Sequence, residues 1–456
     1  MRINSGPLAL DIQMITEDKS KPTHWGYTVS VRGGGAQVNA LKLESETTYA
    51  DYAGSFGEEV LLTAWFVEDD VNKVILPNAK DLELIVTRRS LGSAQSGGTQ
   101  SRQGYTDRYK ATITDVTVPE VGESNSVSRD SKNAMKRLTF QLFDRALYEL
   151  KAISVGGILR HSSAADALNV LLTAKSSALT IDDAVKPLGV TMVPADTALN
   201  AQGKPNLREH IVIKDGTQLT ALARYLQQHC GGIYNNGIGC FYVRRQWYVY
   251  PLYDSSRFAN CQQSLTLIRV PSETMPDVPH SYTMRGNHLF ALATDEAISI
   301  DNTDHKQLNQ GNGTLFATAS GVMDKFVPRD DSKAMASQSD VMGRIAVEQR
   351  PDGLNNAVFG QRRISDNIAE QISGLSARNQ QFMQVAWAYS DPALVYPGMP
   401  VRLLYANGNK VEAMVGTVHA IETFTELSTP GMATQHYQCK SVLTLSVTKQ
   451  PENKIG

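Results

Sequence analysis

The sequence predicts a β-rich α+β protein of several domains, with a small strand–helix–hairpin domain between two larger β domains. Its 456 residues exceed the roughly 250–300 that one hydrophobic core supports, so two to four domains are expected. Most segments alternate apolar and polar residues with a period of two, which is typical of half-buried strands. We place the domains at residues 1–160, 161–263 and 264–456.

Strand patterns dominate the first domain. Tyr109, Ala111 and Ile113 start one apolar face, which resumes at Val116 one residue out of phase, as a β-bulge produces. A polar, glycine-rich run at 90–104 is expected to form a mobile loop, because it has too few apolar side chains to bury. Three further sets each share one face of a predicted strand: Tyr27, Val29 and Val31; Leu82, Leu84 and Val86; and Leu138, Phe140 and Leu142.

The middle domain is predicted to begin with a helix at residues 163–176. Ser162 or Ser163 supplies its capping oxygen, and apolar residues recur at helical spacing behind it. Residues 184–206 contain three prolines and are expected to be an irregular connection.

A second helix in the middle domain is predicted between a strand at 210–214 and a hairpin. Asp215-Gly216-Thr217 is expected to cap this helix, and Gly231-Gly232 ends it by allowing positive φ. Two aromatic strands follow, joined tightly through Arg244-Arg245. The buried stripe of the helix is expected to be Leu219, Leu222, Ala223, Leu226 and Cys230.

The third domain is predicted to be mainly strand. A polar loop is expected at 301–315, and amphipathic helices near 334–349 and 364–378. From Phe382 onward only strands are expected. Asn407-Gly408 separates two of them and is a strong signal for a tight hairpin.

The composition excludes several classes of protein. The 44 basic and 46 acidic side chains nearly cancel, which argues against a sequence-specific nucleic-acid binder. No stretch approaches the roughly 20 apolar residues of a membrane span, and no signal peptide opens the chain, so folding in a cytoplasm is expected. The four cysteines form no CxxC pair and are expected to be reduced.

No motif for catalysis is present. The sequence lacks a nucleophile elbow, a zincin helix, a P-loop, a calcium loop and a dinucleotide-binding fingerprint. We therefore assign no catalytic, cofactor-binding or metal-ligating residue and expect no cofactor.

An aromatic run with two arginines is the candidate binding feature. Bases and sugar rings stack on such faces, but a covered sheet face or a subunit contact accounts for it equally well, and we favour packing or an interface. The run contains Phe241, Tyr242, Trp247, Tyr248, Tyr250 and Tyr253, with Arg244 and Arg245. Its candidate interface residues are Arg244, Arg245, Trp247, Tyr248 and Tyr250.

The order of elements resembles baseplate hub proteins of tailed phages and the matching hubs of contractile injection systems. The resemblance covers most of the chain and is carried by loose local motifs. These are Leu138–Asp144 at the end of the first β domain, the helix at 163–176, Ile211–Thr217, Gly231-Gly232, Trp247–Tyr253 and Tyr396–Val401.

This resemblance implies a structural, non-enzymatic virion protein. Its two large domains would be tube-like β-barrels, and three copies would form a pseudo-sixfold ring. That ring would join the hexameric tail tube to a separate central spike and would contact other baseplate proteins, after assembly in the host cytoplasm. Arg102, in the loop at 90–104, is then a further candidate interface residue.

Two alternatives come from other classes. A tail-associated cell-wall hydrolase would need carboxylates that converge in a cleft. A carbohydrate-binding module would bind glycans through the face of Trp247.

Overall fold

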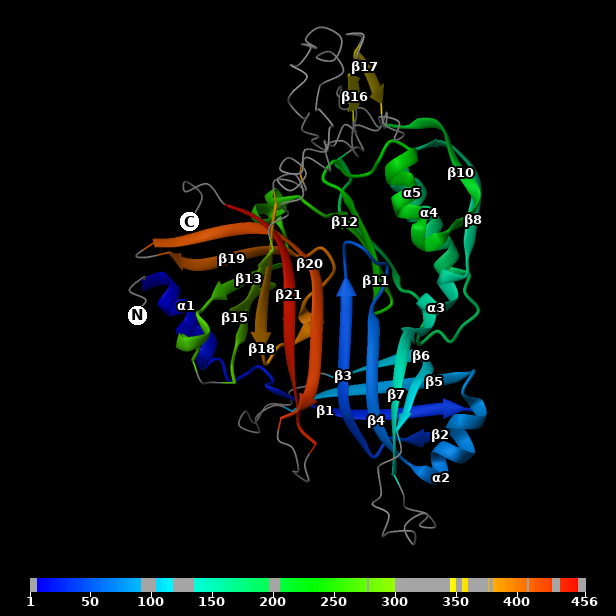
Figure 1. The fold of residues 1–456 in the computed structure, drawn as a ribbon, viewed down its shortest axis with the longest axis vertical. Coiled ribbons are helices and arrows are strands. Elements are labelled where there is room, and N and C mark those ends of the chain that lie inside the picture. Colours follow the sequence, from blue (N-terminus) through cyan, green and yellow to red (C-terminus); the bar gives the residue numbers. More distant parts are fainter. Residues whose placement is uncertain are drawn as a thin grey trace.

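One large mixed sheet organises the chain. The computed structural model describes residues 6–91, 104–117, 135–196, 206–276, 279–299, 345–349, 355–359, 376, 380–407, 410–428 and 435–449. Within these residues a 14-stranded sheet runs through both large β regions, and three small sheets accompany it. The sheet bends so that its strands close into two rings, with a mixed α/β module above the first ring (Figure 1).

The first ring is closed by antiparallel pairs of eight strands. A single residue pair, Trp25 with Tyr437, makes the last closure. The strand β2 (Ala36–Asn39) pairs with the second half of β1, on the edge opposite β5. In order around the ring, the strands are β1 (His24–Gly33), β5 (Leu82–Leu91), β6 (Gly104–Thr117), β7 (Met135–Asp144), β4 (Glu59–Val67), β3 (Lys42–Asp51), β20 (Lys410–Leu427) and β21 (Tyr437–Lys449).

The second ring contains six strands and is mixed in direction. The strand β13 runs parallel to both of its neighbours, whereas the other neighbours pair antiparallel. The strand β14 (Tyr282–Arg285) extends it beside β15. In order, the strands are β13 (Ser264–Arg269), β19 (Pro400–Asn407), β20, β21, β18 (Gln381–Ala388) and β15 (His288–Ser299).

The two rings share β20 and β21. These strands pair with each other along almost their whole length, from Met414 opposite Lys449 to Leu427 opposite Tyr437. The first half of β20 pairs with β19 of the second ring, and its second half pairs with β3 of the first. A bulge between Val418 and Ala420 marks the crossing point, because a bulge bends a strand and increases its twist. Strands of the predicted third domain thus complete the ring of the predicted first domain.

The middle module packs helices against two small sheets. Its hydrophobic cluster begins with Ala146, so α3 and β8 pack with it although the predicted boundary lay at residue 160. The module contains α3 (Arg145–Lys151), β8 (Ser154–Ser162), α4 (Ala164–Ser177), β9 (Gly189–Met192), β10 (Arg208–Gln218), α5 (Leu222–His229), β11 (Ile238–Val243) and β12 (Gln246–Pro251). The strand β10 pairs with β8, and β12 pairs with both β11 and β9.

Both predicted helices of this module are present. Ser163 caps α4 by accepting from the Asp166 amide. The predicted stripe of α5 is buried from Leu219 to Cys230, and Gly231-Gly232 ends the helix with positive φ. The predicted cap at Asp215-Gly216-Thr217 is wrong: these residues belong to β10, where the register shifts between Ile213 and Thr217.

Several other predictions can be compared with the structure. The bulge in β6 is confirmed between Ile113 and Asp115, and the tight hairpin is confirmed by the pairing of Asn407 with Lys410. Residues 345–349 form the strand β16, paired with β17 (Asn355–Phe359), so the helix predicted at 334–349 is wrong there. The rest of that helix, the loop at 301–315 and nearly all of 364–378 lie outside the described residues.

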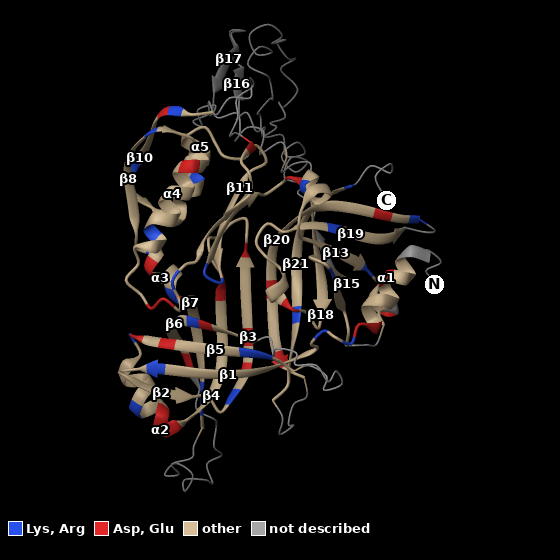
Figure 2. Cartoon of the chain, turned by 180° about the vertical axis from the view of Figure 1, so that it is seen from behind, with Lys and Arg blue, Asp and Glu red and all other residues tan. Residues whose placement is uncertain are grey.

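The remaining elements are short, apart from one helix that was not predicted. The helix α1 (Gly6–Glu17) buries Leu8 and Ile15 against strands of the second ring. The others are α2 (Glu68–Asp70), the turns Val71–Ile75 and Leu76–Asn78, and 3-10 turns at Leu219–Ala221, Ser255–Asn260, Ser272–Thr274 and Pro392–Leu394. Among the described residues, none of the helices has the length and apolar character needed to cross a membrane. Figure 2 shows acidic and basic residues interspersed over the rings and the middle module.

Candidate functional site

The inward face of the first ring changes from apolar to charged along its own strands. In β5 the buried alternation of Leu82, Leu84 and Val86 continues with Arg88. In β6 the stripe that includes Tyr109 continues to Asp107. Because side chains two apart in a strand share a face, the period that builds the core also places these charges inside the ring.

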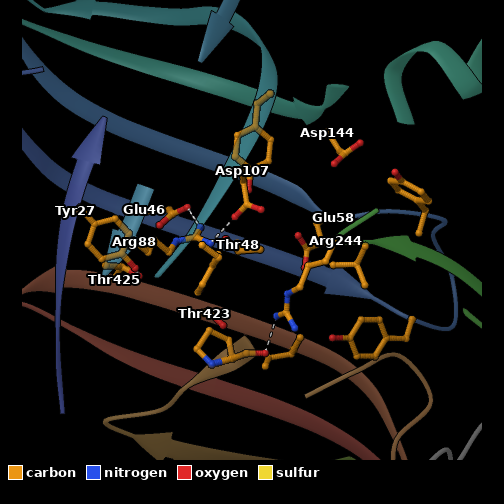
Figure 3. A pocket seen from close by; sticks show the side chains of 17 residues that line it. Tyr27, Glu46, Thr48, Glu58, Arg88, Asp107, Asp144, Arg244, Thr423 and Thr425 are labelled. Atoms are coloured by element: carbon orange, nitrogen blue, oxygen red, sulfur yellow. Dashed lines mark hydrogen bonds and ion pairs between the residues drawn. The ribbon is translucent and has the colours of Figure 1, made fainter. Parts of the chain in front are cut away.

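Arg88 is the centre of a buried ion network. Its guanidinium donates to Glu46, which is 2% exposed, and to Asp107 at 3.0 Å. It also lies over the rings of Tyr27 and Tyr105, 5.7 and 5.1 Å from their centroids. Figure 3 shows Arg88 between Tyr27 and Asp107. One cation is thus held by two carboxylates and two aromatic faces, a set of partners that compensates its loss of water.

Two more carboxyl groups and a second arginine line the same space. Figure 3 shows Glu58 beside Arg244, which enters from the turn between β11 and β12. Burial raises the pKa of Glu58 to about 7, although Arg244 acts in the opposite direction. Burial likewise raises the pKa of Asp144 to about 6, although its carboxylate caps α3 by accepting from the Leu147 amide. Both groups therefore titrate near neutral pH.

The cavity among these groups, which we call the charged chamber, is small. It has a volume of about 50 Å³, room for a few waters but not for the roughly 300–1,000 Å³ of a typical ligand pocket. Two buried atoms at its wall, Glu46 Oε2 and Tyr242 Oη, have no hydrogen-bond partner among the described residues. Carboxylates do converge here, as a hydrolase would require, but a sugar ring has no room between them.

The turn that carries Arg244 has an unusual backbone. Arg244 and Arg245 have φ of 50° and 66°, a left-handed region that two-residue hairpin turns normally fill with Asn and Gly. Arg244 donates to the carbonyls of Pro392 and Ala393 in the second ring. Arg245 donates to those of Asp183 and Lys186 in the middle module. The strained turn therefore connects two parts of the molecule through side chains that extend in opposite directions.

The hairpin itself is buried on both faces. Tyr250 packs into the second-ring cluster and donates to the Tyr52 carbonyl. Trp247 packs into the middle-module cluster and donates to Ser176 at 3.1 Å. Both residues therefore pack within the chain. The ring of Trp247 is fully buried, which excludes a glycan site on its face. Arg102 lies outside the described residues.

Tyr248, by contrast, lines an open groove between the hairpin and the second ring. The groove has a volume of about 740 Å³, within the range of ligand sites. Tyr248 stacks on Tyr396 with centroids 6.1 Å apart and planes at 23°. We call this space the Tyr248–Tyr396 groove. Arg244 borders both it and the charged chamber. Among the described residues no cluster of three potential metal ligands is present.

Part of this geometry was accessible from the sequence. The aromatic run identified Arg244 and Tyr248, and Tyr396 lies in a motif that carried the family resemblance. Arg88 and Asp107 were missed, although each continues a period-two stripe, which is the signal that identifies them. Arg257 of the groove belongs to a short 3-10 turn and has no such signal.

Comparison with known proteins yields structural likeness only. No family model matches the chain, and no curated protein sequence does. A tail protein from Neisseria meningitidis MC58 is similar over 92% of this chain and 96% of its own, with 12% identity and a TM-score of 0.43. The 43 kDa tail protein of prophage MuSo2 from Shewanella oneidensis matches 92% of this chain and 98% of its own, with 10% identity and a TM-score of 0.42.

A third likeness is to a component of the type VI secretion system of E. coli. It covers 92% of this chain and 77% of that one, with 9% identity and a TM-score of 0.40. That protein exhibits structural similarity to two T4 bacteriophage tail proteins. The chain is thus similar, over most of its length, to phage tail proteins and to secretion-system components, as its element order predicted. At these identities the likeness is a distant one.

Proposed function

We propose that this chain is a structural hub subunit of a phage tail or a related contractile injection system, and that it has no enzymatic activity. Three copies form a ring that joins the hexameric tail tube to a separate central spike and contacts other baseplate proteins. The protein is assembled in the host cytoplasm and resides in the tail of the virion.

The observation that carries this proposal is the pair of strand rings in one chain. Two β-barrel-like units per subunit, repeated in a trimer, supply six units to a sixfold partner. Because the rings share β20 and β21, their relative orientation is fixed by backbone hydrogen bonds. A fixed orientation is what a symmetry-matching adaptor needs. The rings are not equal, since one has eight strands and the other six.

The exposed residues of the hairpin turn are candidates for contacts in this assembly. Arg244 is exposed in the isolated chain, and Arg245 and Tyr248 are partly exposed. Arginine and tyrosine are enriched in protein interfaces. The small volume of the charged chamber supports a structural role over hydrolysis.

Mass photometry and negative-stain microscopy of the full chain test the proposal. We expect trimers, alone or after mixing with the tail-tube protein of the same particle, and threefold class averages with six peripheral lobes. A chain that stays monomeric under all of these conditions would contradict the trimeric hub. Rings with another number of subunits would reject the symmetry match.

A further inference from the structure

We propose that the Tyr248–Tyr396 groove binds an extended, carboxylate-bearing segment of a partner protein. This inference rests on the proposed function, because a hub subunit has protein partners rather than substrates. It assigns a specific docking site and a specific ligand chemistry to one face of the chain.

The groove has a defined frame. Tyr248 of β12 and residues between Ala393 and Met399 line it side by side, since the ring of Tyr248 stacks on that of Tyr396. The 3-10 turn Ser255–Asn260 and the chain that follows it, up to Gln263, also contribute to the lining. Tyr396 is fixed in place because its hydroxyl donates to the Gln263 carbonyl at 3.1 Å. Pre-formed walls of this kind lower the entropic cost of binding an extended chain.

The charged side chains that line the groove are all basic, although Glu58 of the charged chamber lies beside Arg244. Arg244 and Arg257 border the groove, and its lining contains no Asp or Glu. Each arginine is positioned by backbone carbonyls: Arg257 donates to Gly398 at 3.0 Å, and Arg244 to Pro392 at 2.8 Å. A guanidinium has five N–H donors, so these bonds orient each group and leave further donors for a ligand. The complementary ligand is an anion, and carboxylates fit guanidinium groups best.

The remaining lining favours a polypeptide among anionic ligands. It includes aromatic, methionine and arginine side chains, which are enriched at protein interfaces, and no Lys, Asp or Glu, which are depleted there; uncharged polar side chains complete it. Met284, Met399 and Leu394 offer apolar contacts. Asn260 and Gln262 are exposed amides at the rim that can pair with the backbone of an extended segment.

A model peptide tests the inference with the full-length chain. The probe is a fluorescein-labelled octapeptide of alternating leucine and aspartate, followed by fluorescence polarisation. Its counterpart has lysine in place of aspartate. We expect saturable binding of the acidic peptide, at least tenfold weaker binding of the basic one, and loss of affinity with added salt. No binding of the acidic peptide at millimolar concentration, or equal affinity for both, would overturn the inference.

Substitutions at an exposed rim residue separate binding from folding. Gln262→Glu should weaken binding of the acidic peptide at least threefold, and Gln262→Lys should strengthen it, because the two substitutions add opposite charges at the same exposed position beside the groove. Tyr248→Ala should weaken binding tenfold or more by removing half of the stacked pair. The matched control is Arg224→Gln on the exposed side of α5, which should leave affinity unchanged.

The pattern across variants decides the outcome. If all variants bind the acidic peptide as the wild type does, it binds elsewhere and the assignment is wrong. Displacement of the peptide by oligogalacturonate with equal affinity would indicate an acidic glycan instead and would also overturn it. Ring formation is recorded in the same samples. If rings form but the peptide does not bind, the proposed docking site in the groove is wrong and the hub function stands. If the peptide binds but the chain is always monomeric, the hub function is wrong.

Discussion

Both rings are closed by strand pairing, but they have different interiors. The second ring encloses apolar side chains such as Leu267, Leu403 and Leu445 around Trp387, whose indole donates to Ser281 at 3.0 Å. The first ring is equally apolar at one end, but at the other it holds the Arg88 network. This charged end faces the hairpin turn and the second ring (Figure 3). Charge inside this protein therefore marks the place where its parts meet.

The difference also sets how each interior responds to change. An apolar core loses contacts in proportion to the volume removed. An ion network fails more abruptly, because the loss of one member leaves its partner charged and without water. The first ring should thus be sensitive to single substitutions and to pH, and the second ring mainly to volume.

Arg88→Met should give the largest effect. It leaves Glu46 buried without its cation, which costs about 3–5 kcal/mol in such cases. Chemical denaturation measures this loss of unfolding free energy, taken from the first unfolding transition that appears as denaturant is added. The double variant Glu46→Gln with Arg88→Met should recover part of it. A single variant as stable as the wild type would show that the network does not stabilise the first ring.

Trp387→Phe in the second ring should cost about 2 kcal/mol, through lost volume and a lost hydrogen bond to Ser281. Its cost should be the same at pH 5 and pH 8, since the change involves no ionisable group. Differential scanning calorimetry at both pH values checks this. If the stability cost of Trp387→Phe depended strongly on pH, the two rings would not differ in their response to pH.

Glu58→Gln should have an effect that depends on pH. The pKa of Glu58 is raised from 4.5 to about 7, so the folded chain holds this proton more tightly than the unfolded chain. The wild type therefore loses stability as pH rises from about 4.5 to about 7, and glutamine, which stays neutral, avoids that loss. The melting temperature of Glu58→Gln should equal that of the wild type near pH 4.5 and exceed it at pH 8. A difference that is constant with pH would contradict the burial of this carboxyl group.

Arg32→Met should have the smallest effect and is the matched control for Arg88. Arg32 pairs with Glu83 across β1 and β5, on the outside of the same ring, where its side chain is 44% exposed. Exposed pairs contribute about 0–1 kcal/mol, so the variant should melt within a few degrees of the wild type. If Arg32→Met lowered the free energy of unfolding as much as Arg88→Met does, the cost of losing an arginine would not depend on whether it lies inside or outside the ring.

The sequence was sufficient to predict local features of this architecture, namely strand faces and helices, but not its long-range strand pairing. Period-two stripes such as Leu82, Leu84 and Val86 identified the inward faces. The cap Ser163 identified α4, and the apolar stripe with Gly231-Gly232 identified α5 although its predicted cap was wrong. The sharing of β20 and β21 was not accessible, because it depends on pairings across more than 350 residues, such as Thr423 with Thr48. Burial of Trp247 was equally hidden, since a local pattern does not reveal that a hairpin has a core on both faces.

The shared strands have a consequence for biosynthesis. The first ring begins with β1 near residue 24 but closes only through β20 and β21, which end at Lys449. During translation its first six strands emerge long before their last two neighbours, so β3 and the part of β1 before Ser30, which β2 does not cover, present open edges for most of that time. Open edges promote association between nascent chains. We therefore expect the N-terminal half of the chain to need protection by chaperones on the ribosome, and completion of both rings to be one late, cooperative event.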